Sequence, residues 1–311
     1  MPAAPKRLDT DQDTFVERLH LDRVDRDIFT GWCHAGAPLR AFGGQVAAQA
    51  LVAAGTTVEQ PDRRVHSLHS YFLRAGRTTD PIVYLVDRPR DGRSFSTRRV
   101  KAVQYGETIF TMSASFANDS AGPTHQSTHA SAEIAKQWIS KVPQPETIAP
   151  MKWFASMKSE SAADRAAKLK AAGYPQREFV DMRVVDAEFA RSTGRADQMA
   201  WYRAMEPLPD DPLIHACSVT YFSDLSLVAT VTGHHGGRSG TAGLEVTSID
   251  HAMWFHLPVR ADEWLLFVTD SPISAAGRGF ARGQFYRQDG VLVASASQEV
   301  LIREPVERAP R

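Results

Sequence analysis

Three polar residues in the second half of this 311-residue chain have side chains that could do chemistry together: Asp224, Ser248 and Gln298. A carboxylate whose pKa is raised by burial can take a proton, and a hydroxyl and an amide can orient a water molecule. Such a set can hold one water and accept its proton as the water attacks a carbonyl carbon. The pattern around each residue decides whether the three can meet.

Gln298 lies in the segment VASASQEVLI, which alternates like a strand. It shares a strand face with Ala294, Ala296 and Val300, so the alternation predicts that its amide is buried among aliphatic residues. A buried amide without partners is destabilising by a few kcal/mol, roughly, so its presence calls for polar neighbours. A solvent-facing Gln near a strand end is the alternative.

Asp224, in YFSDLSL, shares a predicted helix face with Cys217 and Tyr221 and has no cation within two turns. The alternative is an exposed carboxylate on a thin polar side of that helix. Ser248 directly precedes IDHAMWFH. It lies opposite His66 if the two histidine-containing strands are aligned on His69 and His251.

The elements that would position these residues occur twice. Residues 92–116 and 277–298 both begin Gly-Arg-x-Phe, turn at a glycine and continue into Ser-Ala-Ser. The segments 65–73 and 248–256, two apolar strand candidates and the helical segments 42–55 and 211–231 also pair, in the same order. Four ordered pairings predict a duplicated domain.

Residues 42–55 carry no charge, and a helix that is apolar on nearly every face must be covered on nearly every face. We therefore expect an α+β fold, a tandem (double) hotdog. Two long central helices would each be wrapped by a curved antiparallel sheet, with the sheets joined to remove exposed edges. We expect an N-terminal hotdog domain over 10–118, a linker with surface helices over 119–176, and a C-terminal hotdog domain carrying the polar residues over 177–305.

Bulk composition excludes several classes of function. Lys plus Arg equals Asp plus Glu, 36 against 36, so we expect no nucleic-acid or membrane partner. Cys33 and Cys217 are far apart, and the N-terminus lacks an apolar signal region, so we expect a cytoplasmic protein. No G-x-S-x-G, P-loop or H-E-x-x-H motif is present. The basic segment 88–101 is typical of a solvated sheet face, although it could meet a phosphate.

Seven segments together resemble acyl-CoA thioesterase II, the TesB-like family, over residues 10–117 and 178–303. They are FGGQVAAQAL, VHSLHSYFLRAG, RDGRSFSTRRV, YFSDLSL, SIDHAMWFH, DEWLL and ARGQFYRQDGVLVASASQE. The resemblance implies a double hotdog that hydrolyses fatty acyl-CoA without a metal or organic cofactor. It also implies catalytic roles for Asp224, Ser248 and Gln298. Ser248 stands where many relatives have Thr, and we expect its hydroxyl to suffice.

Two other functions remain open. One is an acyl-CoA hydratase or dehydratase on the same fold, for which His66 or His69 could supply the base. The other is a non-catalytic acyl-CoA-binding protein, in which the three polar residues only satisfy one another. In each case the partner is an acyl-CoA molecule, and assembly into a homo-oligomer also remains open.

Overall fold

The computed structural model describes residues 14–33, 40–126, 132–149, 177, 179–194, 196–236 and 244–304. The elements of the first half are α1 (Phe15–Leu19), β1 (Asp22–Asp25), β2 (Ile28–Gly31), α2 (Gly43–Thr56), β3 (Arg64–Phe72), β4 (Ile82–Asp91), β5 (Phe95–Gln104) and β6 (Glu107–Ala117). Those that follow are α3 (Ala132–Ile139), β7 (Val180–Val184), α6 (Ala187–Ser192), β8 (Gln198–Ala204), α7 (Pro212–Ser223), α8 (Leu227–Gly233), β9 (Glu245–Ser248), β10 (Asp250–Phe255), β11 (Leu265–Ala275), β12 (Arg278–Arg287) and β13 (Leu292–Arg303).

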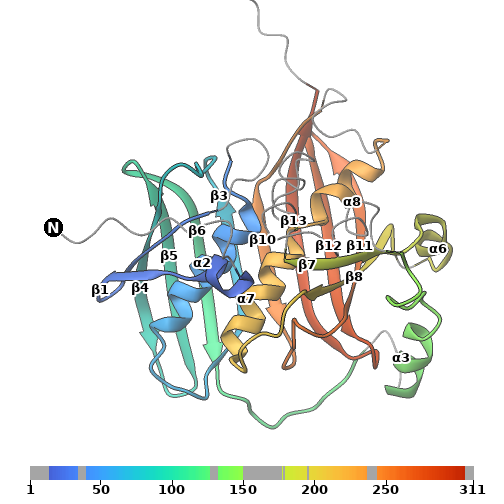
Figure 1. Ribbon diagram of the computed structural model, residues 1–311, viewed down its shortest axis with the longest axis horizontal. Coiled ribbons are helices and arrows are strands. Elements are labelled where there is room, and N and C mark those ends of the chain that lie inside the picture. Colours follow the sequence, from blue (N-terminus) through green and yellow to red (C-terminus); the bar gives the residue numbers. More distant parts are fainter. Residues whose placement is uncertain are drawn as a thin grey trace, which may run out of the picture.

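The described strands form one continuous sheet in the order β1-β2-β4-β5-β6-β3-β10-β13-β12-β11-β8-β7, with β9 pairing to β13. Its two halves lie side by side (Figure 1). They are joined where β3 and β10 pair antiparallel, with His69 opposite Ala252 and Leu68 opposite Met253. The prediction of two hotdog sheets merged into one is confirmed.

The repeated hairpins form as the sequence predicts. β5 turns into β6 at Tyr105 and Gly106, whose φ angles are 51° and 76°. Two consecutive positive φ angles make the tight turn that matches the twist of paired strands. The second copy turns through Gly290, whose φ is 84°. Both hairpins then enter a strand that reads Ser-Ala-Ser.

The helices α2 and α7 pack against each other near the junction of the two sheet halves (Figure 1). Glycines on α2 allow the close approach: a Cβ on Gly44 would lie 2.8 Å from the Tyr221 carbonyl oxygen, and one on Gly55 would lie 2.5 Å from Leu213. The start of α2 therefore faces the end of α7. Both helices are buried on nearly every face, as their apolar composition predicts.

The second central helix differs from the prediction of one long helix over 211–231. It is divided into α7 and α8 by a turn at residues 224–226, where the Leu225 N–H bonds the Phe222 carbonyl. Asp and Ser side chains at 223–226 favour helix ends over helix interiors, which explains the break. α7 packs on α2, whereas α8 lies over β11, β12 and β13.

Within the described ranges, one helical segment, Pro212–Gly233, is long and apolar enough to cross a membrane by length and composition. The sequence did not lead us to expect one. However, 83% of its apolar window is buried inside the protein, where α2 and the sheet cover it.

The segment between the two copies packs partly on the second half of the sheet. Ile139 at the end of α3 and Val142 join a core cluster with Trp201, whose indole N–H donates to the Pro143 carbonyl at 2.9 Å. The linker segment SESAADRAAKLKAAG (159–173) reads as one of the surface helices and lies outside the described residues. The segment REFVDMRVVDAEF (177–189) reads as a strand, but β7 ends at Val184, because Asp186 caps helix α6 by accepting from two backbone N–H groups.

Candidate active site

Gln298 is fully buried on the inner face of β13, so the solvent-facing alternative is wrong. The neighbours on its own strand face are Ala296 and Val300, both buried, as the alternation predicts. Its Nε2 donates to Ser248 Oγ at 2.7 Å, and its Oε1 lies 2.7 Å from His251 Nδ1. The amide is thus held by one side chain from β9 and one from β10.

Strict alternation would place Ser248 and His251, three residues apart, on opposite faces of the sheet. Both contact Gln298 because the pairing shifts between β9 and β10: Ser248 lies opposite Val300, whereas Ala252 lies opposite Ser297. This irregularity leaves the Glu299 N–H of β13 without a partner in the β-ladder. The N–H donates instead to the Asp250 carboxylate at 2.6 Å.

Asp224 lies at the C-cap of α7, where the helix breaks, and only 9% of its surface is exposed. Burial raises the pKa of its carboxyl group from 3.8 to about 7, against the opposing effect of hydrogen bonds from the Gly44 N–H, Gln298 and Ser248. Its Oδ1 has no hydrogen-bond partner within the described part of the chain. The structure therefore brings the three predicted residues together and leaves one carboxylate oxygen free.

Both halves of the chain build this site. A Cβ on Gly43, the first residue of α2, would lie 2.9 Å from Asp224 Oδ2, so the carboxylate sits directly on the N-terminus of that helix. The first N–H groups of a helix are free of intrahelical partners and carry partial positive charge. They favour the ionised carboxylate, whereas burial favours the protonated form.

Sequence reasoning missed His251, which contacts the Gln298 amide, and Ser223, which contacts His251. His251 is 1% exposed, and its Nε2 lies 2.8 Å from Ser223 Oγ at the end of α7. Burial lowers the pKa of His251 to about 4, although its hydrogen bond to Gln298 acts in the opposite direction. The ring is therefore neutral at ordinary pH. No residue signature in the sequence marks the bulge between 248 and 251 that brings His251 to the amide.

The alignment of His69 with His251 is wrong. In β3, Leu68 pairs with Ala114 of Ser-Ala-Ser, and in β10 Met253 pairs with Ala296 of the second Ser-Ala-Ser. Leu68 and Met253 are thus equivalent. The alignment of His69 with His251 is therefore displaced by three residues from the structural alignment.

This correction moves the histidines away from the site. His251 corresponds to His66, but a bulge between Val65 and Ser67 turns His66 to the outer face, where it contacts Ser115 Oγ at 2.8 Å. His69 is exposed on the same outer face and packs edge-on against Trp254. Neither histidine faces Asp224, so neither can serve as the base that a hydratase would need there.

The first half contains a different set at the corresponding place. Ser96 pairs with Phe116 just as Ala281 pairs with Gln298, so Phe116 occupies the position of the amide. Arg98, two residues beyond Ser96, is fully buried and donates to Asp91 Oδ1 at 2.9 Å and to both oxygens of Thr57. The expectation that the basic strand is a solvated face is therefore wrong for Arg98.

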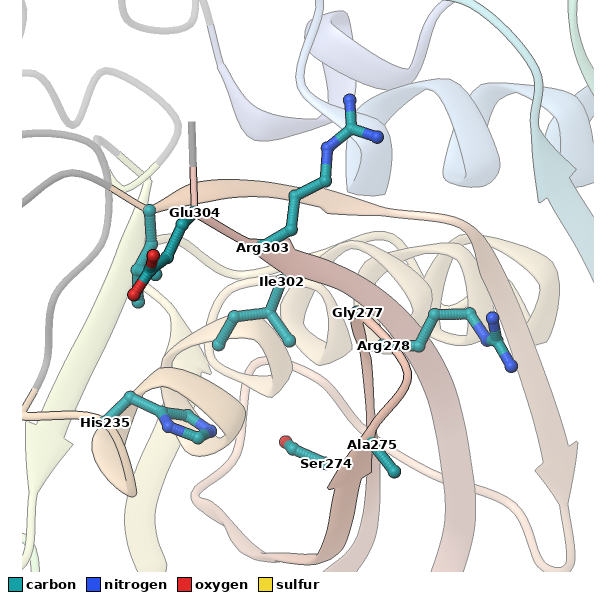
Figure 2. Close-up of a pocket in the computed structure, with 9 residues that line it drawn as sticks. His235, Ser274, Ala275, Gly277, Arg278, Ile302, Arg303 and Glu304 are labelled. Atoms are coloured by element: carbon teal, nitrogen blue, oxygen red, sulfur yellow. The ribbon is translucent and has the colours of Figure 1, made fainter. Parts of the chain in front are cut away.

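A cavity of about 230 Å³ lies apart from Asp224, Ser248 and Gln298, beyond the C-terminal end of α8 (Figure 2). Ile302 lines it from β13, four residues along from Gln298, and His235 lines it from the end of α8. The two arginines at its rim are already paired, Arg278 with Glu299 and Arg303 with Glu245. It shares strand β13 with Gln298, but none of the three polar residues lines it.

The single sheet joined from two halves defines the class as a double-hotdog protein. Residues 29–117 match the family model of the acyl-CoA thioesterase N-terminal domain, and residues 175–301 match that of acyl-CoA thioesterase. A solved structure described as having a hot dog fold, from Alicyclobacillus acidocaldarius, superposes with a TM-score of 0.69 at 19% identity and supports the fold alone.

Two curated relatives and one solved structure are similar over nearly the whole chain. Acyl-coenzyme A thioesterase 8 of Homo sapiens is 35% identical over 92% of this chain and 87% of its own length. Acyl-CoA thioesterase 2 of Haemophilus influenzae is 34% identical over 93% and 96%. The acyl-CoA thioesterase II TesB2 of Mycobacterium marinum is 39% identical, with a TM-score of 0.73, over 93% and 98%. The chain belongs to the acyl-CoA thioesterase family and is a thioester hydrolase.

Proposed function

We propose that this protein hydrolyses fatty acyl-CoA to the free fatty acid and CoA, with one water activated by Asp224, Ser248 and Gln298. The observation that carries the proposal is the position of Asp224. Its carboxyl group is buried, its pKa is raised to about 7, and its Oδ1 has no partner in the described structure. A carboxylate with these properties is suited to accept a proton near neutral pH.

In the proposed reaction, the water oxygen attacks the thioester carbonyl carbon while Asp224 takes one of its protons. The tetrahedral intermediate then collapses, and the carbon–sulfur bond breaks. CoA leaves as a thiolate, which takes up the proton held by Asp224. Because a thiol has a pKa near 8.5, it departs without a strong acid, so the site needs no second carboxyl group.

Ser248 and Gln298 have the complementary role of holding the water and the carboxylate. The Gln298 amide donates to Ser248 Oγ at 2.7 Å, and both side chains favour the ionised form of Asp224. Once Ser248 Oγ accepts from the amide, its own proton is free to be donated. The hydroxyl can therefore donate to either Asp224 or the water.

The thioester substrate is tested by measuring thiol release from acyl-CoAs of increasing chain length. The proposal predicts steady release of one thiol per acyl group consumed, with the free acid as the other product. A non-catalytic acyl-CoA-binding protein would retain the ligand without releasing thiol. Conversion of the acyl-CoA into a hydrated or dehydrated acyl-CoA, without release of free thiol, would indicate a hydratase or dehydratase instead.

A further inference from the structure

We propose that His251 is a positioning residue that fixes the Gln298 amide with its N–H groups toward Ser248 and Asp224. This inference rests on the proposed function, because it assigns a residue that supports the same three groups. His251 is fully enclosed, and its ring contacts Gln298 and Ser223. It would act through the amide and not on the substrate.

The amide can face Asp224 with its nitrogen or with its oxygen, and only one orientation works. An ionised carboxylate accepts hydrogen bonds but donates none. If Gln298 Oε1 faced Asp224, two acceptors would meet in a buried site. With Nε2 toward Ser248 and Asp224, the amide can supply one N–H to each, and Nε2 lies 2.7 Å from Ser248 Oγ.

The opposite end of the amide selects the tautomer of His251. Gln298 Oε1 can only accept, so the His251 Nδ1 that lies 2.7 Å from it must carry the proton. In a neutral ring Nε2 then accepts. Ser223 Oγ, 2.8 Å away, is the hydroxyl that can donate to it. Ser223 Oγ also lies 2.8 Å from the Thr220 carbonyl oxygen, so that carbonyl and His251 Nε2 share its one proton. From His251 onward the hydrogen bonds run in one direction, through Gln298 to Ser248.

His251 is itself anchored from both halves of the chain, its backbone carbonyl by the first and its ring by the second. The Ser70 hydroxyl of β3 donates to the His251 carbonyl oxygen at 2.7 Å, across the junction of the two sheets. Ser223 lies one residue before Asp224, at the end of α7. The residue that orients the amide is therefore tied to the helix end that carries the carboxylate.

The test is a double-mutant cycle between His251→Phe and Gln298→Ala, read as kcat and KM for thiol release. Phe keeps a ring of similar size but has no donor for Oε1. We expect His251→Phe to lower kcat by roughly tenfold or more, less than loss of the general base, with KM little changed. In the Gln298→Ala protein, the same change should lower kcat by less than about twofold, because the amide it orients is gone.

His215→Phe is the matched control. His215 is a second buried histidine, 3% exposed, whose Nδ1 accepts from the Ala261 N–H at 3.1 Å on the other end of α7. We expect it to lower the melting temperature without changing kcat. His251→Gln, which restores a donor, should recover part of the kcat lost in His251→Phe.

Wild-type kcat in folded His251→Phe, or losses that multiply in the double mutant, would overturn the positioning role alone. If His251→Phe does not fold, the same cycle is run between Ser223→Ala, which removes the contact to His251 Nε2, and Gln298→Ala, and multiplying losses there would overturn it equally. Wild-type turnover in Gln298→Ala would instead remove the amide from the mechanism. That result would contradict the proposed function as well.

Discussion

Gln298 Nε2 donates a hydrogen bond to Ser248 Oγ at 2.7 Å, although the two residues are 50 positions apart in the chain. The contact requires the shift in pairing that separates β9 from β10, which turns Ser248 to the inner face. It joins two of the three polar residues directly. Asp224 completes the set from the end of α7. There its carboxylate also lies against the N-terminus of α2, in the first half of the chain.

Ser248→Ala and Gln298→Ala should each lower kcat for thiol release by less than Asp224→Asn does. In the proposed mechanism, both changes remove groups that position the water and the carboxylate, and neither removes the proton acceptor. Residues that act as one unit are not independent, so each should add little to the loss in an Asp224→Asn protein. Steady-state kinetics of the single and double variants test this. Losses that multiply would show that the three groups act separately.

The pH dependence of kcat/KM should report the ionisation of Asp224. The active form is the carboxylate, so kcat/KM should rise with pH and level off above about 7, where burial places this pKa. Ser248 and Gln298 lower that pKa, so replacing either by Ala should move the rise to higher pH. Rates from pH 5 to 9, corrected for spontaneous hydrolysis, test both shifts. A flat profile in the wild-type protein would exclude Asp224 as the titrating base.

Each chain should bind one equivalent of a non-hydrolysable acyl-CoA analogue at a working site. The first half has Phe116 at the place of Gln298, and a buried Arg98 beside Asp91. A phenyl ring cannot hold a water molecule by hydrogen bonds, and the guanidinium group of Arg98 is already paired with Asp91. Calorimetric titration should therefore approach one per chain. Two equal sites, both lost on changing Asp224, would contradict the asymmetry between the copies.

Much of the fold could be predicted from the sequence because the chain repeats itself. The apolar helix α2, the hairpins and the inward face of β13 follow from composition, turn glycines and alternation. The register could not be predicted, because a bulge adds one residue to a strand without leaving a fixed residue signature. The alignment matched His251 with His69, three residues beyond its true equivalent His66, and the bulges near His66 and Ser248 hid the contact between His251 and Gln298.

The helix break and the burial of Arg98 were missed for a different reason. Local patterns indicate which residues favour a helix end, but the packing of α7 on α2 and α8 on the sheet decides where the break falls. Arg98 looked solvated because its neighbours in sequence are charged. In the structure, Asp91 and Thr57 supply the partners that allow a guanidinium group to be buried.

The central claim is that Asp224 is the general base, and Asp224→Asn tests it through turnover and stability measured on one sample. Asn keeps the size of the side chain but cannot accept the proton, so kcat should fall roughly 10²–10⁴-fold with acyl-CoA binding little changed. Because the folded-state pKa is raised from 3.8 to about 7, the carboxylate destabilises the fold progressively from pH 4 to 7 and fully above that.

Asp224→Asn should therefore stabilise the protein at pH 8, by about 4 kcal/mol at most, and have little effect near pH 4. Asp181→Asn is the matched control: Asp181 is 8% exposed and pairs with Arg183 at 2.6 Å, so its loss should lower the melting temperature and spare turnover. The account predicts a more stable, nearly inactive Asp224→Asn protein at pH 8. A less stable protein with unaltered thiol release would contradict it.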